Sequence, residues 1–187
     1  MTIWSHIPNM LTVLRILLVP LTIWTLSQGD YQLAFFAFLT AGITDGVDGY
    51  IARRFKLQTE LGAYLDPLAD KFLLVSVFVT LAVMKVLPPW VAILAVTRDV
   101  LIVGAVVLAR VLEKPVVIKP VMISKVNTAA QISLAVGLLA SLAFGEINAG
   151  LLLVANLTVA FLTVASGAVY MALWFRHMAK ETDGEKL

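Results

Sequence analysis

Cysteine is absent from the 187 residues, which excludes disulfides, thiolate metal sites and cysteine nucleophiles. Charge is also scarce, because 14% of the residues are charged while 60% are hydrophobic. That balance is too apolar for a soluble domain of this length and is typical of a chain with several membrane-spanning helices. The first nine residues, MTIWSHIPN, have neither a basic region nor a small-residue cleavage site. We therefore expect no signal peptide and a first apolar run that stays in the membrane.

Long apolar runs, each about 20 residues as a bilayer requires, make up most of the chain. The six predicted spans cover residues 11–26, 31–48, 61–84, 90–110, 120–144 and 147–175. They predict an all-α membrane protein with six transmembrane helices. No repeat or linker of domain size interrupts the runs, so we expect a single domain, 1–187. A short interfacial segment is expected at 1–9 and a polar tail at about 177–187, in which residues 180–187 are expected to be frayed.

The basic residues alternate between the two sides of the predicted membrane. They are concentrated after the second and fourth spans and in the tail, at Arg53, Arg54, Lys56, Arg110, Lys114, Lys119, Arg176, Lys180 and Lys186. The other connections hold no Lys or Arg except Lys85. Because cytoplasmic connections are richer in Lys and Arg, both termini are predicted to be cytoplasmic.

Four aspartates lie within one 26-residue stretch between the second and third spans. Asp45 and Asp48 close the second span, and Asp66 and Asp70 open the third. Spacings of three and four residues place each pair on one face of a helix. We predict a cytoplasmic turn at 49–60, which brings the four carboxylates together at the cytoplasmic mouth of the protein.

Carboxylates gathered at one point repel one another, and one or two divalent cations would relieve that repulsion. Oxygen ligands suit Mg²⁺ or Mn²⁺, and the lack of His and Cys ligands argues against zinc. Such clusters usually hold Mg²⁺ beside substrate phosphates. The small residues Gly49, Ala52 and Gly62 leave room for a bulky ligand, and Arg53 supplies a fork for phosphate. Two alternatives remain open: acids that are only solvated at the surface, and a cation channel or transporter that uses them as ion ligands.

The pattern Asp45-x-x-Asp48-Gly49-x-x-Ala52-Arg53, eight residues, Gly62-x-x-x-Asp66-x-x-x-Asp70 resembles the signature of the CDP-alcohol phosphotransferases. The resemblance implies an enzyme that transfers a phosphatidyl or similar group from a CDP-activated donor to an alcohol and releases CMP. It also implies that the four aspartates bind a metal pair and that Asp70 is the general base. The implied pocket for the cytidine diphosphate donor consists of Asp48, Gly49, Ala52, Arg53, Gly62 and Asp66.

The N-terminal stretch from Pro8 to Arg15 resembles the start of family members that use CDP-diacylglycerol. In that interpretation Asn9 or Thr12 lies near the donor. The alternative is that Asn9 caps a helix and Arg15 is a surface cation whose stem lies along apolar surface.

Two stretches bear on the acceptor alcohol. Arg98 lies inside the fourth span, where a cation needs a partner or an anionic ligand. We expect Arg98, Lys125, Asn127 and Lys119 to bind the acceptor. The alternatives are an Arg98–Asp99 pair that only joins helices, a snorkelling Lys125, and an ordinary cytoplasmic charge at Lys119.

The sequences Thr97-Arg98-Asp99-Val100 and Ser124-Lys125-Val126-Asn127-Thr128-x-x-Gln131 resemble the eukaryotic-type, CMP-forming cardiolipin synthases. Relatives that use glycerol 3-phosphate more often have a second lysine where this chain has Asn127. Loss of that cation suits a phosphodiester acceptor, which carries less charge than a monoester. The resemblance implies phosphatidylglycerol as acceptor and cardiolipin as product, with phosphatidylglycerophosphate synthesis as the alternative.

Further expectations concern the setting of the protein. The lack of a presequence favours a bacterial inner membrane with the active site at its cytoplasmic face, and the family resemblance favours a homodimer. The small residues Ala165, Ser166, Gly167 and Ala168 are expected to serve close helix packing. Nothing in the sequence indicates a nucleic-acid partner.

Overall fold

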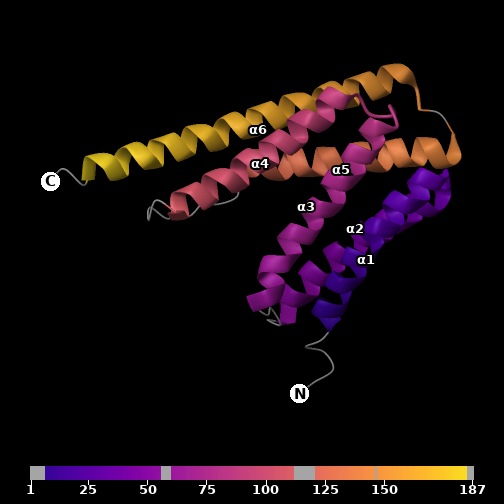
Figure 1. Cartoon of the computed structure of the whole chain (residues 1–187), viewed down its shortest axis with the longest axis horizontal. Coiled ribbons are helices and arrows are strands. Elements are labelled where there is room, and N and C mark those ends of the chain that lie inside the picture. The colour runs from indigo at the N-terminus through magenta and orange to yellow at the C-terminus, as the bar shows by residue number, and fades with distance from the viewer. Residues whose placement is uncertain (1–6, 56–59, 112–120, 146, 185–187) are drawn as a thin grey trace. The chain divides into compact units, whose positions relative to one another are not determined.

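The computed structural model describes residues 7–55, 60–111, 121–145 and 147–184. In the stretches 7–13, 45–55, 60–70 and 177–184, and at residues 16, 106 and 110, only the helix is described and not the side chains. The described residues form helices without strands (Figure 1). The helices are α1 (Ile7–Gln28), α2 (Tyr31–Phe55), α3 (Glu60–Val83), α4 (Pro89–Val111), α5 (Met122–Phe144) and α6 (Ala149–Gly184).

Each helix corresponds to one of the predicted spans, but two boundaries differ from the prediction. The turn predicted at 49–60 is wrong in extent, because α2 continues to Phe55 and α3 begins at Glu60. The polar tail predicted at about 177–187 continues α6 as far as Gly184. Both stretches lack proline and contain good helix formers such as Ala, Arg, Lys and Glu, so nothing ends the helix where hydrophobicity falls.

Three of the described helices are long and apolar enough to cross a membrane: Pro89–Ala109, Met122–Phe144 and Ala149–Arg176. Shorter apolar segments occupy Leu17–Gln28, Tyr31–Thr44 and Lys71–Val83. These lengths and compositions characterise an integral membrane protein.

The chain divides into two compact units. The first contains residues 1–87 and 135–148, and the second contains 88–134 and 149–187. Helix α5 belongs to both, since its first half lies in the second unit and its second half in the first.

In the first unit, the turn between α1 and α2 ends one helix and begins the next. Gly29 has a φ of 81°, a left-handed conformation that glycine adopts without steric cost. Its N–H donates to the carbonyl of Leu26 (3.2 Å), and the N–H of Asp30 donates to that of Thr25 (3.0 Å), which is a Schellman cap. Asp30 then caps α2, because its Oδ1 accepts from the N–H of Leu33 (3.1 Å). The two helices are thereby fixed as neighbours in sequence and space.

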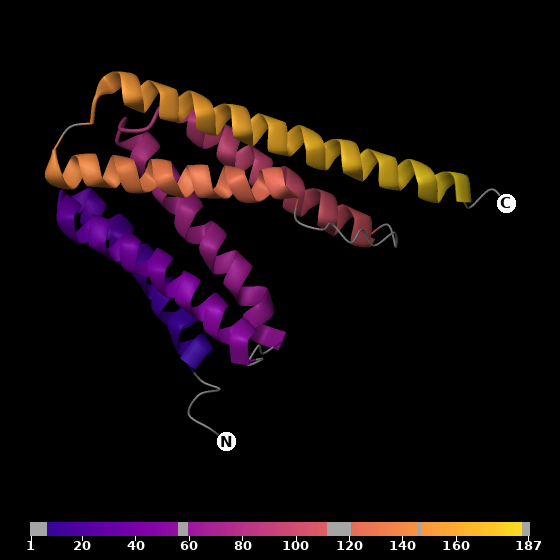
Figure 2. The same cartoon turned by 180° about the vertical axis from the view of Figure 1, so that it is seen from behind.

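The core of the first unit forms where α1 contacts α2 and α3 (Figure 2). Small residues allow close approach, and Ala34 and Ala41 on α2 are fully buried. The second half of α5 also contributes, because the ring of Phe144 lies edge-on to that of Phe35 at a centroid distance of 5.2 Å. This packing holds the helices that carry the four aspartates.

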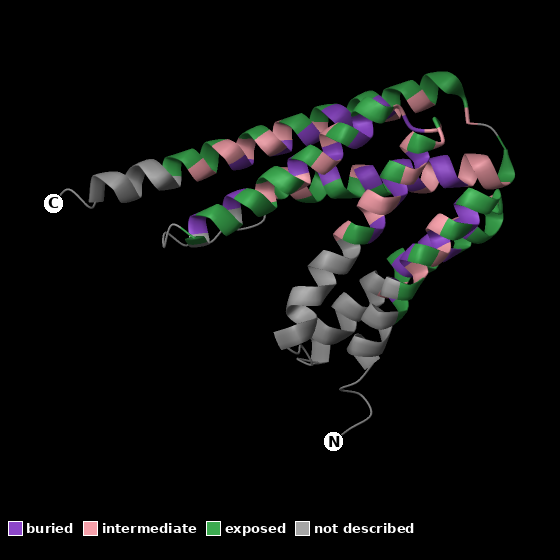
Figure 3. Cartoon of the chain, in the orientation of Figure 1, coloured by how far each residue is buried: buried purple, intermediate pink, exposed green. Residues whose placement is uncertain are grey.

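In the second unit, α4 runs alongside α6 (Figures 1 and 2). Buried residues recur along α4 at helical spacing among exposed ones, at Ala92, Ala95, Arg98, Ala105 and Ala109 (Figure 3). Most are alanines, which let the two backbones approach closely. The indole N–H of Trp174 on α6 donates to the carbonyl of Ala105 on α4 (3.1 Å). Arg98 is the single long side chain in this buried row of alanines.

Candidate functional site

The four aspartates lie on consecutive helices of the first unit. Asp45 and Asp48 are on α2, and Asp66 and Asp70 are on α3. Asp45 lies as many residues before the end of α2 as Asp70 lies after the start of α3, about 15 Å along each helix at 1.5 Å per residue. Asp48 and Asp66 lie closer to those ends, at about 9–10 Å. Asp45 and Asp70 therefore lie at equal distances from the helix ends that flank residues 56–59, and Asp48 and Asp66 lie at nearly equal, shorter distances.

The other predicted donor-binding residues lie on the same helices. Gly49, Ala52 and Arg53 follow Asp48 on α2, Gly62 precedes Asp66 on α3, and Asn9 and Thr12 are in the first turns of α1. Their side chains, like those of the aspartates, lie outside the described residues. Among the side chains that are described, no group of three or more His, Cys, Asp or Glu forms a metal site. Asn9 is no helix cap, since α1 begins at Ile7.

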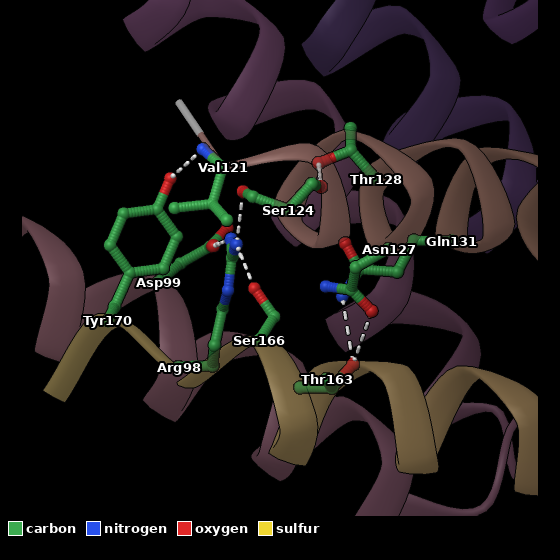
Figure 4. Close-up of polar contacts among 10 residues, drawn as sticks. All are labelled: Arg98, Asp99, Val121, Ser124, Asn127, Thr128, Gln131, Thr163, Ser166 and Tyr170. Atoms are coloured by element: carbon green, nitrogen blue, oxygen red, sulfur yellow. Dashed lines mark hydrogen bonds and ion pairs between the residues drawn. The ribbon is translucent and has the colours of Figure 1, made fainter. Parts of the chain in front are cut away.

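Arg98 is the centre of a polar cluster in the second unit (Figure 4). Its side chain is 5% exposed. Nη1 pairs with Asp99 Oδ1 at 2.6 Å, and Nη2 donates to the hydroxyls of Ser124 on α5 and Ser166 on α6. The distance to Ser166 Oγ is 2.7 Å. Nε is buried and has no hydrogen-bond partner among the described residues. The Arg98–Asp99 pair of the alternative interpretation is present, and the guanidinium also joins three helices.

Tyr170 lies beside this guanidinium. The Cζ atom of Arg98 is 5.7 Å from the centroid of the Tyr170 ring, within the range of a cation–π contact. The Tyr170 hydroxyl accepts a hydrogen bond from the N–H of Val121 at 3.4 Å, just before α5 begins (Figure 4). Tyr170 thus contacts both the cation and the start of α5.

Asn127 belongs to a second polar group between α5 and α6, close to Arg98 in Figure 4. It is fully buried, and its Oδ1 accepts from the hydroxyl of Thr163 at 2.9 Å. The same hydroxyl oxygen accepts from Gln131 Nε2 at 3.4 Å. Asn127 Nδ2 has no partner within the described part of the chain. Asn127, predicted to bind the acceptor, is therefore a neutral amide whose oxygen is hydrogen-bonded to α6. Its buried NH2 group has no partner among the described residues.

The two predicted lysines differ in what the structure describes. Lys125 is exposed on the first turn of α5. Lys119 lies outside the described residues. Of the predicted acceptor residues, Arg98 and Asn127 thus lie in one polar region of the second unit.

Sequence reasoning missed the contributions of α6. Thr163, Ser166 and Tyr170 recur at spacings of three and four and are all buried on the face toward α4 and α5. Ser166 had been interpreted as a packing residue, and its hydrogen bond to Arg98 adds a polar role. The signal that would have found them is this row of hydrogen-bonding side chains at helical spacing.

Arg15 was also misread from the sequence. The interpretation as a surface cation is wrong, because Arg15 is 1% exposed on α1. α1 contacts both α2 and α3, the helices that carry the aspartates. A fully buried guanidinium is retained only where other groups compensate its charge, so Arg15 is part of the interior of the first unit.

Comparison with known proteins shows to which family the chain belongs. The family model described as CDP-alcohol phosphatidyltransferase matches residues 5–172. The chain is 35% identical over 183 residues to the human protein named cardiolipin synthase (CMP-forming), covering 89% of this chain and 60% of the human one. It is 36% identical over 143 residues to the probable cardiolipin synthase (CMP-forming) of Drosophila melanogaster, covering 68% and 44% of the two chains. The chain thus spans less than two thirds of the length of these relatives.

Bacterial proteins with a different named activity are about as similar. The CDP-diacylglycerol–glycerol-3-phosphate 3-phosphatidyltransferase of Bacillus subtilis strain 168 is 33% identical over 184 residues, which cover 89% of this chain and 94% of that enzyme. The family model extends over most of the chain and includes the aspartate pattern and the Arg98 cluster. The chain is a member of the CDP-alcohol phosphatidyltransferase family.

Proposed function

We propose that this protein is a cardiolipin synthase, which transfers the phosphatidyl group of CDP-diacylglycerol to phosphatidylglycerol and releases CMP. The observation that carries the proposal is the four-aspartate pattern, placed on two consecutive helices at matched distances from their connection. Both units contribute to one catalytic domain, a proposal supported by the family model, which extends across them.

The aspartates form the catalytic part of the site. Asp45, Asp48, Asp66 and Asp70 would hold one or two Mg²⁺ or Mn²⁺ ions, and their all-oxygen donor set fits these cations. When bound, the metal supplies positive charge that neutralises the phosphates of the donor. Asp70 removes the proton from the acceptor hydroxyl, because an alcohol is a poor nucleophile at neutral pH without a positioned base.

The surrounding helix positions bind the donor. Gly49, Ala52 and Gly62 leave space for the cytidine nucleotide close to the α2 and α3 backbones, and Arg53 contacts its phosphates. Asn9 and Thr12 reach the donor from the first turns of α1. Support comes from the contacts of α1 with both aspartate helices.

Arg98 binds the phosphate of the acceptor. It is a buried cation whose Nε–H has no partner among the described residues, and an unsatisfied buried donor costs about 1–3 kcal/mol until a ligand accepts from it. Ser124 places the guanidinium at the first turn of α5, where the backbone N–H groups also favour an anion. Lys125, exposed on the same turn, adds positive charge there, and we also propose Lys119, which lies outside the described residues, as an acceptor-binding cation.

Asn127 favours a diester as acceptor. Its side chain is neutral and is engaged by Thr163, so this position adds no second cation beside Arg98. One phosphate charge, as in phosphatidylglycerol, matches one guanidinium better than the nearly two charges of glycerol 3-phosphate do. A neutral residue at position 127 therefore favours phosphatidylglycerol over glycerol 3-phosphate as the acceptor.

The proposed setting is the cytoplasmic membrane of a bacterium, with six spans, both termini and the active site at the cytoplasmic side, and a homodimeric assembly. Three described helices long enough to span a membrane and the alternation of Lys and Arg support this topology.

Phosphatidylglycerophosphate synthesis is the second candidate function. It is favoured by the match to the Bacillus subtilis enzyme over 94% of that protein's length. The deciding experiment supplies purified protein with CDP-diacylglycerol and either acceptor, and identifies the lipid product by mass spectrometry. Cardiolipin from phosphatidylglycerol supports the proposal, whereas a product from glycerol 3-phosphate alone establishes the second candidate.

A further inference from the structure

The Arg98 guanidinium is held by two hydroxyl groups that come from different helices. Its Nη2 atom carries two N–H donors, and both are used, one by Ser124 on α5 and one by Ser166 on α6. The Ser166 hydroxyl is fully buried and lies 2.7 Å from Nη2. The stem of Arg98 passes close to the neighbouring turn of α6, since a Cβ added to Gly167 would lie 3.6 Å from Arg98 Cγ. One end of the guanidinium is therefore fixed in position and orientation by α6.

A serine hydroxyl and a carboxylate differ in how they change the net charge beside a guanidinium. Ser166 satisfies an N–H of the guanidinium and adds no negative charge of its own. The acid paired with Arg98 among the described residues is Asp99, which contacts Nη1. The buried Nε–H has no partner among the described residues. The arrangement fixes one edge of the guanidinium and leaves a donor unsatisfied.

Tyr170 links this cation to the beginning of α5. Its ring lies 5.7 Å from Arg98 Cζ, and its hydroxyl accepts from the N–H of Val121. The N-terminus of a helix carries partial positive charge, so a cation beside it is unfavourable unless an anion lies between or near them. Asp99 supplies such an anion at Nη1, and Ser166 and Tyr170 contact the guanidinium at the same place.

We propose that Ser166 and Tyr170 of α6 are positioning residues that hold the Arg98 guanidinium at the first turn of α5 for the acceptor phosphate. The inference rests on the proposed role of Arg98. It predicts that loss of the Ser166 hydroxyl weakens binding of the acceptor and leaves binding of the donor unchanged. If α6 only packs against α4, the same substitution affects stability and both substrates alike.

The test measures KM for phosphatidylglycerol and for CDP-diacylglycerol separately, as mole fractions in mixed detergent micelles, with CMP release as the readout. For Ser166→Ala we expect KM for phosphatidylglycerol to rise about tenfold or more, as expected for one hydrogen bond to a charged group. KM for CDP-diacylglycerol and kcat at saturation should stay within about twofold of the parent values. The matched control is Ser133→Ala, because the exposed Ser133 hydroxyl bonds only to the Ala129 carbonyl of its own helix among the described residues.

A second variant keeps the proposal open to refutation. Tyr170→Phe retains the ring and loses the hydroxyl, so it tests the link to α5 even if Ser166→Ala fails to fold. We expect a smaller rise in KM for phosphatidylglycerol, about two- to fivefold, since a neutral hydrogen bond is lost. Unchanged acceptor KM in both variants, or equal changes for donor and acceptor, would overturn the positioning role.

Arg98→Lys separates this inference from the proposed function. A lysine keeps the charge but loses the planar fork, so KM for phosphatidylglycerol should rise by more than it does in Ser166→Ala. If Arg98→Lys leaves the acceptor KM unchanged, the proposed role of Arg98 fails and the inference fails with it. If Arg98→Lys raises the acceptor KM and Ser166→Ala does not, only the inference fails.

Discussion

The Thr163 hydroxyl offers a sharp test of how α6 packs against α5. It donates to Asn127 Oδ1 at 2.9 Å and accepts from Gln131 Nε2 at 3.4 Å, and the Asn127 and Thr163 side chains are 0% and 2% exposed. Thr163→Val removes this hydroxyl while keeping the shape of the side chain. We therefore predict a loss of stability without a loss of volume.

The magnitude follows from the two contacts. The shorter bond contributes about 0.5–1.5 kcal/mol, and the bond at 3.4 Å contributes less because hydrogen bonds weaken with distance. Removing the hydroxyl also leaves the Asn127 carbonyl oxygen buried without its donor, which costs about 1–3 kcal/mol. We expect the free energy of unfolding to fall by about 2–3 kcal/mol.

Unfolding of the detergent-solubilised protein by sodium dodecyl sulfate, followed by circular dichroism, measures this change. The matched control is Thr158→Val on the same helix, since the exposed Thr158 hydroxyl bonds to the carbonyl of Val154 within α6. That variant should change the free energy by less than about 0.5 kcal/mol. In a double-mutant cycle with Asn127→Leu, the coupling between residues 127 and 163 should be about 1–2 kcal/mol. Equal stabilities of the two valine variants, or no coupling in the cycle, would refute the described contact.

Three other predictions concern catalysis, specificity and backbone strain. Asp70→Asn should lower CMP release by about 10²- to 10⁴-fold, because a general base is lost, and CDP-diacylglycerol should still bind; wild-type turnover would contradict the assignment. Asn127→Lys should raise kcat/KM for glycerol 3-phosphate relative to phosphatidylglycerol by about tenfold, since a second cation favours a phosphomonoester, and an unchanged ratio would remove Asn127 from the specificity argument. Lys85→Gly should stabilise the protein by about 0.5–1 kcal/mol, because Lys85 follows α3 with a φ of 61°, and a lower unfolding midpoint would contradict that reasoning.

The helices could be predicted because each is an apolar run of nearly uniform length, which has few other solutions in a membrane. The ends were harder to predict. Hydrophobicity falls near Asp48 and near Phe175, yet both helices continue to Phe55 and Gly184, since helix propensity persists where no proline or cap intervenes. The helix end at Gln28 was clear by contrast, because Gly29 and Asp30 supply both a stop and a start signal.

The candidate site was predictable in part. The aspartates stand out by their spacing, because acids at helical intervals between apolar runs have few structural uses, and their role stays a prediction. Arg98 was expected to need a partner inside a span, and Asp99 provides one. Ser166 and Thr163 could not be assigned from the sequence, since small and hydroxylated residues are common at membrane helix contacts and their partners depend on how α6 faces α5. Arg15 was misread because sequence spacing does not distinguish a snorkelling cation from a buried one.

The most direct test of the central proposal is the identity of the lipid made by the purified protein. The protein is incubated with Mg²⁺, CDP-diacylglycerol and equal amounts of phosphatidylglycerol and glycerol 3-phosphate, and the products are identified by mass spectrometry. We predict cardiolipin and CMP in equal amounts, and no turnover once the metal is chelated. Phosphatidylglycerophosphate as the main product would contradict the proposed acceptor, and undiminished turnover without free divalent metal would contradict the proposed role of the four aspartates.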